Sequence, residues 1–274
     1  MLGDLLDKWR ADLAAWAIPE DITAAVPDSP WVLPRQVFAR RADRVMREPA
    51  GPSYERAREA LGPAGTVLDI GSGAGAACLP LAPYATTITA VDTDQAMLTL
   101  LAERAAAAGL DLHTVHGGWP DVAAQVAPAD VVTCHHVTYN VPDLGPFLTA
   151  LTSHARRLVV VELTAAHPLT SLNPLWLRFH RLRRPDGPTA ADLLAILAEA
   201  GVRAGHTEWN RPAEADYAGF AELVDVTRRR LCLPADRTSE VEAALLDLGS
   251  QRERPGDLGS SGRDVVTIWW EGTG

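Results

Sequence analysis

Three glycines, Gly71, Gly73 and Gly75, alternate with small residues in a pattern that predicts a ligand-binding turn. An apolar run typical of a strand precedes them at residues 67–70, and residues 76–82 after them are expected to be helical. Glycine lets a ligand approach the backbone closely, and the free N–H groups at a helix start point toward it. A strand, a glycine turn and a helix start together predict a nucleotide-binding site.

Two classes of nucleotide fit these glycines. Gly71, Gly73 and Ala76 satisfy the dinucleotide pattern G-x-G-x-x-G/A, which leaves an NAD(P)-dependent oxidoreductase open. Asp69 favours a different ligand, because a carboxylate two residues before the first glycine would repel a pyrophosphate. S-adenosylmethionine has no phosphate, and its sulfonium and ammonium groups suit a nearby carboxylate.

A second acidic residue, Asp92, follows the glycines at the distance expected for a ribose contact. Asp92 ends a β-branched run at residues 86–91 and follows the glycines by about 20 residues, a position from which a carboxylate can accept hydrogen bonds from ribose hydroxyls. A plain turn residue is the alternative for Asp92. Asp94 suits the N-cap of a helix that runs to residue 108, with Gly109 as its stop.

The lysine content separates the two cofactor classes further. Lys8 is the only lysine among the 274 residues. The core therefore offers no lysine for a Walker A phosphate loop, for a Schiff base, or for a Tyr-x-x-x-Lys dehydrogenase pair. This absence weighs against the oxidoreductase and favours S-adenosylmethionine.

The run from Asp69 to Gly75 resembles motif I of the class I S-adenosylmethionine-dependent methyltransferases, D/E-x-G-x-G-x-G. Asp92 with Met97 is similar to the family's second-strand signature, and the resemblance covers residues 55–165. It implies S-adenosyl-L-methionine as cofactor and S-adenosyl-L-homocysteine as product. The residues assigned to the cofactor are Asp69, Gly71, Ser72, Gly73, Gly75, Asp92, Thr93, Met97, Gly118, Trp119 and Cys134.

The loop after the third expected strand departs from the family pattern. In the family this loop contacts the adenine, often through an acid after the strand, whereas here Gly118 takes that place and Trp119 follows. Trp119 is expected either to pack on the face of the adenine or to fill the core.

Catalytic residues are expected in the loop after the fourth strand, because open α/β sheets bind ligands at the carboxyl ends of their strands. His135 and His136 are adjacent there, so they point to opposite sides, and His136 is favoured as general base or substrate contact. The alternative is a histidine that only shapes the pocket. Tyr139 is a candidate substrate contact, and Glu162 is either a base, an orienting group or a charged strand end.

The same loop indicates the kind of acceptor. Asn140, Val141 and Asp143 resemble the corresponding loop of ubiquinone/menaquinone C-methyltransferases and of many small-molecule O-methyltransferases. The N/D-P-P-Y/F sequence of DNA and RNA amino-methyltransferases does not occur there. We expect methyl transfer to an O, N or C atom of a small molecule. A non-catalytic S-adenosylmethionine-binding protein is the second alternative, and no metal is expected because adjacent histidines are poorly spaced as ligands.

Strands alternate with helices along the chain, which predicts an α/β fold with a mainly parallel, doubly wound sheet. The resemblance implies a Rossmann-like sheet of seven strands with an antiparallel last strand. Strands are expected at residues 67–70, 86–91, 113–116, 130–133, 157–162, 202–209 and 264–270, and helices at 94–108, 142–153, 189–200, 216–233 and 239–248.

The domain boundaries are expected near residue 50. Residues 1–50 are predicted to form an N-terminal helical cap, with an ordinary packing layer as the alternative, and residues 51–274 the methyltransferase domain with a helical insertion at about 214–250. Residues 254–263, rich in Gly and Ser, are predicted to be a mobile loop. A helix is also predicted within residues 167–184, and one of its faces carries Arg178, Arg181 and Arg184. This face is either a wall for an anionic substrate or a solvated surface, and the solvated surface is favoured.

Composition limits the partners and the compartment. A net charge of −10 argues against nucleic acid and anionic membranes as partners, and no apolar run is long enough to span a bilayer. The acidic N-terminal residues are unlike a signal peptide. Cys78, Cys134 and Cys232 are few and widely spaced, which suggests a reducing, cytoplasmic environment. The oligomeric state is not predicted.

Overall fold

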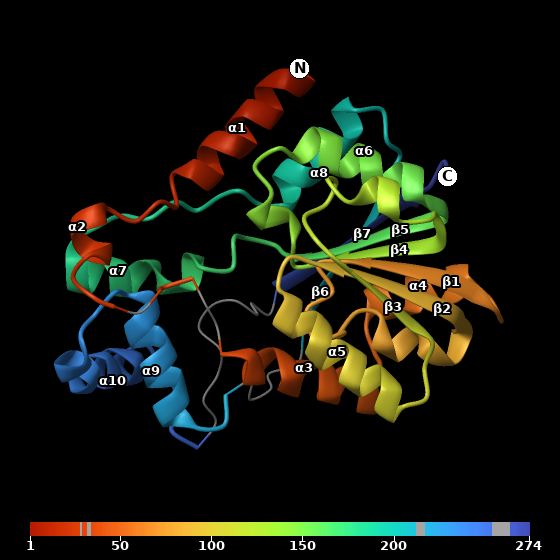
Figure 1. The fold of residues 1–274 in the computed structure, drawn as a ribbon. Coiled ribbons are helices and arrows are strands. Elements are labelled where there is room, and N and C mark those ends of the chain that lie inside the picture. The colour runs from red at the N-terminus through yellow and green to blue at the C-terminus, as the bar shows by residue number, and fades with distance from the viewer. Residues whose placement is uncertain (28, 32–33, 212–216, 254–263) are drawn as a thin grey trace.

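Seven strands form one twisted sheet in the order β3-β2-β1-β4-β5-β7-β6 (Figure 1). The strands are β1 (Gly65–Ile70), β2 (Ala85–Asp92), β3 (Leu112–His116), β4 (Ala129–His135), β5 (Ala155–Thr164), β6 (Gly205–Asn210) and β7 (Asp264–Glu271). All pairs from β3 to β5 are parallel, whereas β7 runs antiparallel to both β5 and β6. The computed structural model describes residues 1–27, 29–31, 34–211, 217–253 and 264–274. The predicted fold class is confirmed.

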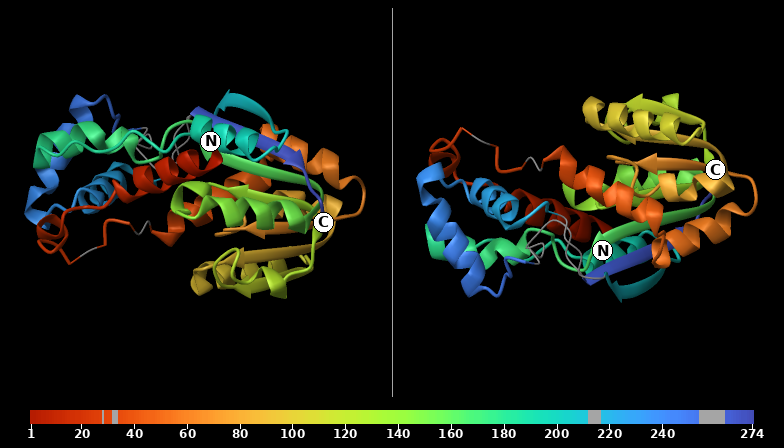
Figure 2. Two further views of the ribbon diagram at one scale, coloured as in Figure 1. Left: turned by 90° about the horizontal axis from the view of Figure 1, so that it is seen from above. Right: turned by 90° about the horizontal axis from the view of Figure 1, so that it is seen from below.

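Helices cover both faces of this sheet, and the two opposite views of Figure 2 show one layer each. The helices are α1 (Leu2–Ala14), α2 (Glu20–Thr23), α3 (Arg35–Arg47), α4 (Pro52–Leu61), α5 (Gln95–Ala107), α6 (Leu144–His154), α7 (Asn173–His180), α8 (Ala190–Glu199), α9 (Phe220–Arg230) and α10 (Thr238–Asp247). Short 3₁₀ helices are η1 (Leu79–Tyr84), η2 (Ala123–Gln125), η3 (Thr138–Asn140), η4 (Thr170–Leu172) and η5 (Ala235–Arg237).

The alternation of side chains along the strands divides the core between these two layers. Leu68 and Ile70 of β1 pack in one cluster with α1, α6 and α8, whereas Val67 packs in another with α4 and α5. Successive residues of a strand point to opposite faces, so a strand buried on both sides must be apolar throughout. This is why the core strands are near-continuous apolar runs in the sequence.

A further apolar cluster lies beside the sheet, where α2, α7, α9 and α10 pack together (Figure 1, left). The predicted insertion contributes α9 and α10 to it. α7 is shorter than the helix predicted for residues 167–184, because it ends at His180 and Arg181 takes a left-handed conformation with φ 54°. The prediction that Arg178, Arg181 and Arg184 share one helical face is therefore wrong: Arg184 instead donates hydrogen bonds to the backbone carbonyls of Trp16 and Ala17.

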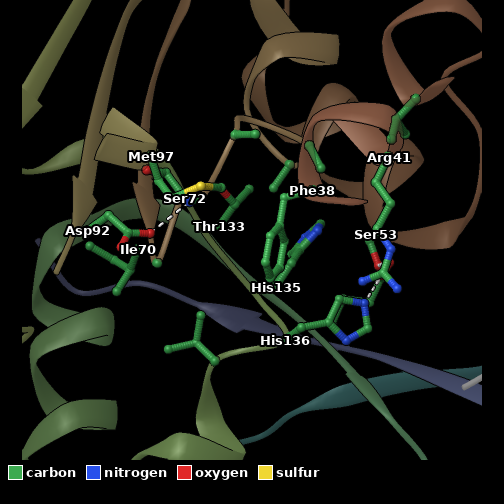
Figure 3. A pocket seen from close by; sticks show the side chains of 18 of the residues that line it. Phe38, Arg41, Ser53, Ile70, Ser72, Asp92, Met97, Thr133, His135 and His136 are labelled. Carbon is green, nitrogen blue, oxygen red and sulfur yellow. Dashed lines mark hydrogen bonds and ion pairs between the residues drawn. The ribbon is translucent and has the colours of Figure 1, made fainter. Parts of the chain in front are cut away.

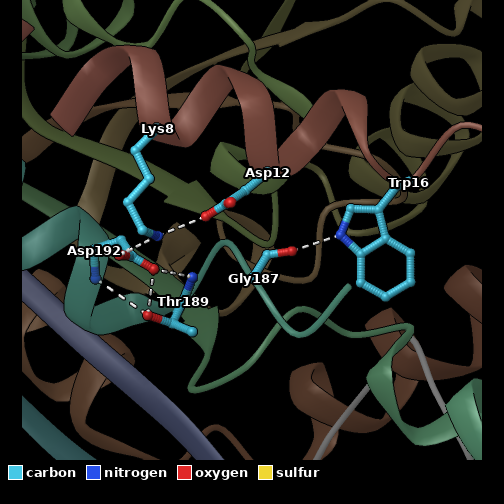
Figure 4. A network of polar contacts seen from close by, with 6 residues as sticks. All are labelled: Lys8, Asp12, Trp16, Gly187, Thr189 and Asp192. Atoms are coloured by element: carbon cyan, nitrogen blue, oxygen red, sulfur yellow. Dashed lines mark hydrogen bonds and ion pairs between the residues drawn. The ribbon is translucent and has the colours of Figure 1, made fainter. Parts of the chain in front are cut away.

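The three helices within the first 50 residues lie in three places, and α2 belongs to the cluster beside the sheet. α1 packs on α8 and α6, where the Lys8 ammonium bridges Asp12 at 2.6 Å and Asp192 at 2.9 Å, and Trp16 Nε1 donates to the Gly187 carbonyl at 2.6 Å (Figure 4). α3 lies instead over the glycine turn, where Ala42 packs with Ala74 and Met97. The division of the chain at residue 50 stays a prediction.

One predicted helix is wrong. Residues 76–78 form turns and residues 79–82 belong to the 3₁₀ helix η1, so the segment is not an α-helix. Pro80 and Pro83 explain the difference, since proline has no N–H to donate and clashes with the preceding turn of an α-helix. The glycine turn is thus not followed by the helix N-terminus that the sequence suggested.

The structure bears on two further expectations, a mobile loop and the absence of a membrane-spanning segment, only through the residues that it describes. Residues 254–263, predicted to be a mobile loop, lie outside the described residues. Within the described part of the chain, no helix combines the length and apolar character needed to cross a membrane.

The start of α8 offers a direct test of how the helical layer is held. Thr189 Oγ1 accepts from the Asp192 N–H at 3.2 Å, and Asp192 Oδ2 accepts from the Thr189 N–H at 2.9 Å, which is a capping box (Figure 4). We expect Thr189→Ala to lower the free energy of unfolding by about 1 kcal/mol. The Asp192 N–H loses its acceptor, and the Asp192 carboxylate that accepts from the Thr189 N–H loses its bond to the hydroxyl. Urea denaturation measures this.

The matched control is Thr99→Ala, on an exposed turn of α5 where the hydroxyl bonds only to the Gln95 carbonyl. It should change the stability by less than about 0.5 kcal/mol. Equal effects of the two substitutions would contradict the capping role.

Candidate functional site

A cavity of about 1360 Å³ opens at the carboxyl ends of β1, β2 and β4 (Figure 3). α3 and α4 form its opposite wall, and residues 209–211 at the end of β6 close one side. Pockets for one small molecule are typically about 300–1,000 Å³. The cavity is therefore large enough for two ligands in contact.

The glycine turn forms one end of this cavity. The N–H groups of Gly71 and Ser72 both donate to the Val91 carbonyl, at 2.8 and 3.1 Å, which joins the turn to β2. Gly71 has φ 70°, and a Cβ there would lie 2.2 Å from Val137 Cγ2. Gly73 has φ 51°, yet a Cβ there would meet only Met97 Cε, at 3.8 Å. Gly71 is thus required by packing, whereas the surface at Gly73 is open to a ligand.

Asp92 joins the second strand to the same turn. Its Oδ2 accepts the Gly73 N–H at 2.7 Å, as the dashed line at Asp92 in Figure 3 shows. Its Oδ1 accepts the Asp94 N–H at 2.8 Å. A carboxylate oxygen has two lone pairs, so each oxygen keeps one for a further donor. Asp94 also caps α5, accepting from Ala96 and Met97 as predicted.

Two polar atoms at this end are buried and have no hydrogen-bond partner among the described residues: Ser72 Oγ and Trp119 Nε1. Because buried polar groups are nearly always paired, such atoms in side chains that line a cavity are candidates for hydrogen bonds to a ligand. The residues present therefore fit a nucleoside: a backbone turn open to close approach, an acid with spare lone pairs, and an indole on the wall.

The structure separates the predicted cofactor residues into two groups. Those that line the cavity are Gly71, Ser72, Gly73, Asp92, Thr93, Met97, Gly118 and Trp119. Asp69, Gly75 and Cys134 lie beneath its lining. Asp69 is fully buried, its Oδ1 accepts from Thr133 Oγ1 at 2.8 Å, and burial raises the pKa of its carboxyl. It thereby ties β1 to β4 under the turn.

The other end of the cavity contains His135, His136 and Glu162, as predicted for the loop after β4. Glu162 Oε1 lies 2.5 Å from Arg211 Nη2 and 3.1 Å from His136 Nε2, and Arg211 Nη2 lies 2.9 Å from the same histidine nitrogen. Figure 3 shows Arg41 of α3 directed toward His136 from the opposite wall.

Burial and charge set the protonation of this group. Burial lowers the pKa of His136 from 6.5 to about 4, and Arg211 adds to the effect although Glu162 opposes it. Burial alone would raise the pKa of Glu162, but electrostatic attraction to His135 and Arg211 and the contact with His136 hold it well below its usual range. A neutral His136 beside an ionised Glu162 follows.

A chain of hydrogen bonds with a fixed direction reaches Glu162 from behind. Trp209 Nε1, which can only donate, bonds to Thr267 Oγ1 at 3.0 Å. Thr267 Oγ1 lies 2.7 Å from Ser53 Oγ, and Ser53 Oγ donates to Glu162 Oε2 at 2.6 Å. Every member then has a partner when Thr267 donates to Ser53 and Glu162 is ionised.

Tyr139, the remaining candidate, lies outside the lining of the cavity. It is buried, burial raises the pKa of its phenol, and its ring packs edge-on against His167 at 5.6 Å between centroids. Tyr139 therefore does not contact the space in which a ligand would lie.

Several residues that line this end were not identified from the sequence, namely Phe38, Arg41, Ser53, Trp209 and Arg211. The position of Arg211 could have been inferred from the order of the strands. β6 runs parallel to β5, because both are antiparallel to β7, so the residue after β6 reaches the same edge of the sheet as Glu162. The rule that ligands bind at carboxyl ends of strands would have indicated Arg211.

Comparison with known proteins gives three kinds of match. Residues 67–158 match a family model described as a methyltransferase domain. An uncharacterized protein of Haemophilus influenzae is 34% identical over 142 residues, which are 50% of this chain and 51% of that protein. The match thus spans about half the length of this curated relative.

Solved structures share the fold at low identity. A cyclopropane-fatty-acyl-phospholipid synthase-like protein from Lactobacillus casei gives a TM-score of 0.55 at 14% identity and covers 92% of this chain and 98% of its own. The YcgJ protein from Bacillus subtilis gives 0.54 at 17% identity, with coverage of 81% and 98%.

The low pKa of His136 predicts how stability depends on pH. Between its folded value of about 4 and its ordinary value of 6.5, the unfolded chain binds a proton that the folded chain does not. Stability should therefore fall as the pH drops from about 6.5 toward 4, by up to about 1.4 kcal/mol per pH unit for this group. His167, with a pKa lowered by burial to about 4, should contribute in the same window.

Urea denaturation at several pH values checks this. His136→Gln and His167→Gln should each flatten the slope, whereas His113→Gln, at an exposed side chain, should leave it unchanged. An unchanged slope in His136→Gln would show that this histidine is not held neutral.

Proposed function

We propose that the protein is a class I S-adenosylmethionine-dependent methyltransferase that moves a methyl group to a small molecule, because residues 67–158 match a family model described as a methyltransferase domain. The acceptor atom is O, N or C. The observation that supports this most is one cavity with two different ends. A glycine turn and Asp92 suit a nucleoside at one end, and His135, His136 and Glu162 stand at the other.

Each part of the cofactor has a proposed partner. Asp92 accepts from the ribose hydroxyls, Gly118 and Trp119 contact the adenine, and the turn from Gly71 to Gly73 lies against the remainder. Thr93 and Met97 complete the wall. Three of the residues assigned to the cofactor do not line the cavity but lie beneath it. We assign them the role of holding its surface in place: Asp69, Gly75 and Cys134.

The bound cofactor supplies a methyl group on a sulfonium. The chain's own residues have to hold the acceptor in line with that methyl group, and alignment accounts for much of the rate in such a displacement. The walls formed by α3, α4 and the end of β6 leave a deep cavity in which such an acceptor would lie beside the cofactor. A net charge of −10 favours a small acceptor over nucleic acid. A reducing cytoplasm suits the three buried free cysteines.

Thermal shift with S-adenosylhomocysteine and with NAD(H) tests the cofactor. We expect stabilisation by S-adenosylhomocysteine alone, since binding to the folded state raises the melting temperature. Stabilisation by NAD(H) alone would establish the oxidoreductase instead. Transfer of a labelled methyl group to members of a small-molecule panel then separates an enzyme from a non-catalytic binder, which would bind the cofactor tightly without turnover.

Gly73→Ala tests the turn, and the backbone strain that it adds at φ 51° is matched by a control. An added Cβ meets only Met97 Cε at 3.8 Å, so it should occupy space that the ligand needs. We expect the affinity for S-adenosylhomocysteine to fall at least tenfold, roughly 1.4 kcal/mol. Isothermal titration calorimetry measures the change.

Gly109→Ala is the matched control. Gly109 has φ 68° with nothing within 4 Å of a Cβ, so this variant carries similar backbone strain far from the cavity. It should bind S-adenosylhomocysteine like the wild type. Equal losses in both variants would attribute the effect to strain and remove the support for this turn as the cofactor site.

A further inference from the structure

Two hydroxyl groups, those of Ser53 and Thr267, are buried where the start of α4 meets the sheet. In β7, Thr267 is opposite Glu162 of β5 and Thr207 of β6, so these three side chains lie on the same face of the sheet. Trp209, two positions after Thr207, lies on that face as well. The strand register therefore brings an indole, a hydroxyl and a carboxylate to one face.

The hydrogen bonds of the two hydroxyls run in one direction. Trp209 Nε1 can only donate, so Thr267 Oγ1 accepts from it at 3.0 Å. The Thr267 hydrogen is then available to Ser53 Oγ at 2.7 Å, and Ser53 donates to Glu162 Oε2 at 2.6 Å. A protonated Glu162 that donated to Ser53 would turn the Ser53 hydrogen toward Thr267, and the Thr267 hydrogen would lose Ser53 as its acceptor. The direction of the chain thus suits an ionised Glu162 alone.

The indole at the start of this chain is held by packing as well. Gly51 has φ 100°, and a Cβ there would lie 3.0 Å from Trp209 Cη2 and 3.4 Å from Cζ2. The indole therefore rests on backbone that only glycine leaves open. Gly51 directly precedes α4, and Ser53 is the second residue of that helix. The start of α4 thus holds both the first and the last donor of the chain.

The chain ends on an ion pair in the wall of the cavity. Glu162 Oε2 is bonded to Ser53, whereas Oε1 lies 2.5 Å from Arg211 Nη2. The Arg211 guanidinium also lies 5.8 Å from the centre of the Trp209 ring. Glu162 and Arg211 both line the cavity, but Thr267 does not. The Thr267 hydroxyl can act on the cavity only through the residues that it bonds.

We propose that Thr267 is a positioning residue for the acceptor end of the cavity. Its hydroxyl accepts from Trp209 and donates to Ser53, and Ser53 in turn holds the Glu162 carboxylate where it fixes Arg211 in the wall. For catalysis this rests on the proposed methyl transfer, in which an acceptor must stay in line with the methyl group and therefore needs a wall that does not shift. If Thr267 only filled space in β7, valine would serve equally well.

Nitrogen NMR of the Arg211 guanidinium tests this without an acceptor. A guanidinium held by a carboxylate rotates slowly and gives separate signals for its two terminal nitrogens. In Thr267→Val the rotation should become about fivefold faster or more, because Glu162 loses its fixed position. Thr267→Ser keeps the hydroxyl and should restore the slow rotation. Arg211→Lys assigns the signals.

Thr152→Val is the matched control. Thr152 Oγ1 accepts from Trp270 Nε1 at 2.9 Å, so the same kind of bond is lost at a residue that does not line the cavity. The Arg211 rotation should stay slow in this variant. Should Thr267→Val not fold, Trp209→Phe removes the indole donor with Trp270→Phe as its control, and the same difference is expected. Slow rotation in Thr267→Val, or equally fast rotation in variant and control, would overturn the proposal.

The affinity for S-adenosylhomocysteine distinguishes this proposal from the proposed function. Thr267→Val should bind S-adenosylhomocysteine like the wild type, because its hydroxyl acts at the other end of the cavity. With an acceptor from the methyl-transfer panel, its kcat/KM for that acceptor should fall about tenfold. A matching loss of S-adenosylhomocysteine affinity would indicate general disruption and overturn the positioning role. Failure of the wild type to bind S-adenosylhomocysteine would refute the proposed function, while the Arg211 rotation would still decide the role of Thr267.

Discussion

A single buried carboxylate organises the acceptor end of this molecule. Glu162 ends up away from water, and an ionised group there is tolerated only when charges and donors surround it. Those partners come from different elements: Ser53 from α4, His136 from the end of β4 and Arg211 from the end of β6. The need to satisfy one charge thus fixes where four elements meet.

The two ends of the cavity are built by different means. The cofactor end depends on residues close in sequence, since the glycine turn donates backbone hydrogen bonds to the Val91 carbonyl and to the Asp92 carboxylate at the end of the adjacent strand. The acceptor end depends on contacts between distant parts of the chain, since Ser53 and Glu162 are 109 positions apart in the sequence. The cofactor end can therefore be kept as a unit, while the acceptor end changes with the elements around it.

This difference explains what the sequence could predict. The central strands β1, β4 and β5 were recognisable because strands buried on both faces require nearly continuous apolar runs. Asp92 was recognisable by its spacing from the glycines. The helix expected at residues 76–82 failed because Pro80 and Pro83 interrupt its hydrogen bonding. Arg211 and Ser53 have no local pattern, and they join the site only through the order of β5, β7 and β6.

The double use of Asp92 limits how the site can change. One carboxylate holds the Gly73 N–H and the Asp94 N–H and also faces the cavity, so the shape of the turn and the choice of nucleoside are set by the same atoms. A variant selected for a different cofactor would have to rebuild the backbone of the turn at the same time. Evolution of this protein toward new chemistry is therefore easier at the acceptor end, where walls can be exchanged while the nucleoside end stays intact.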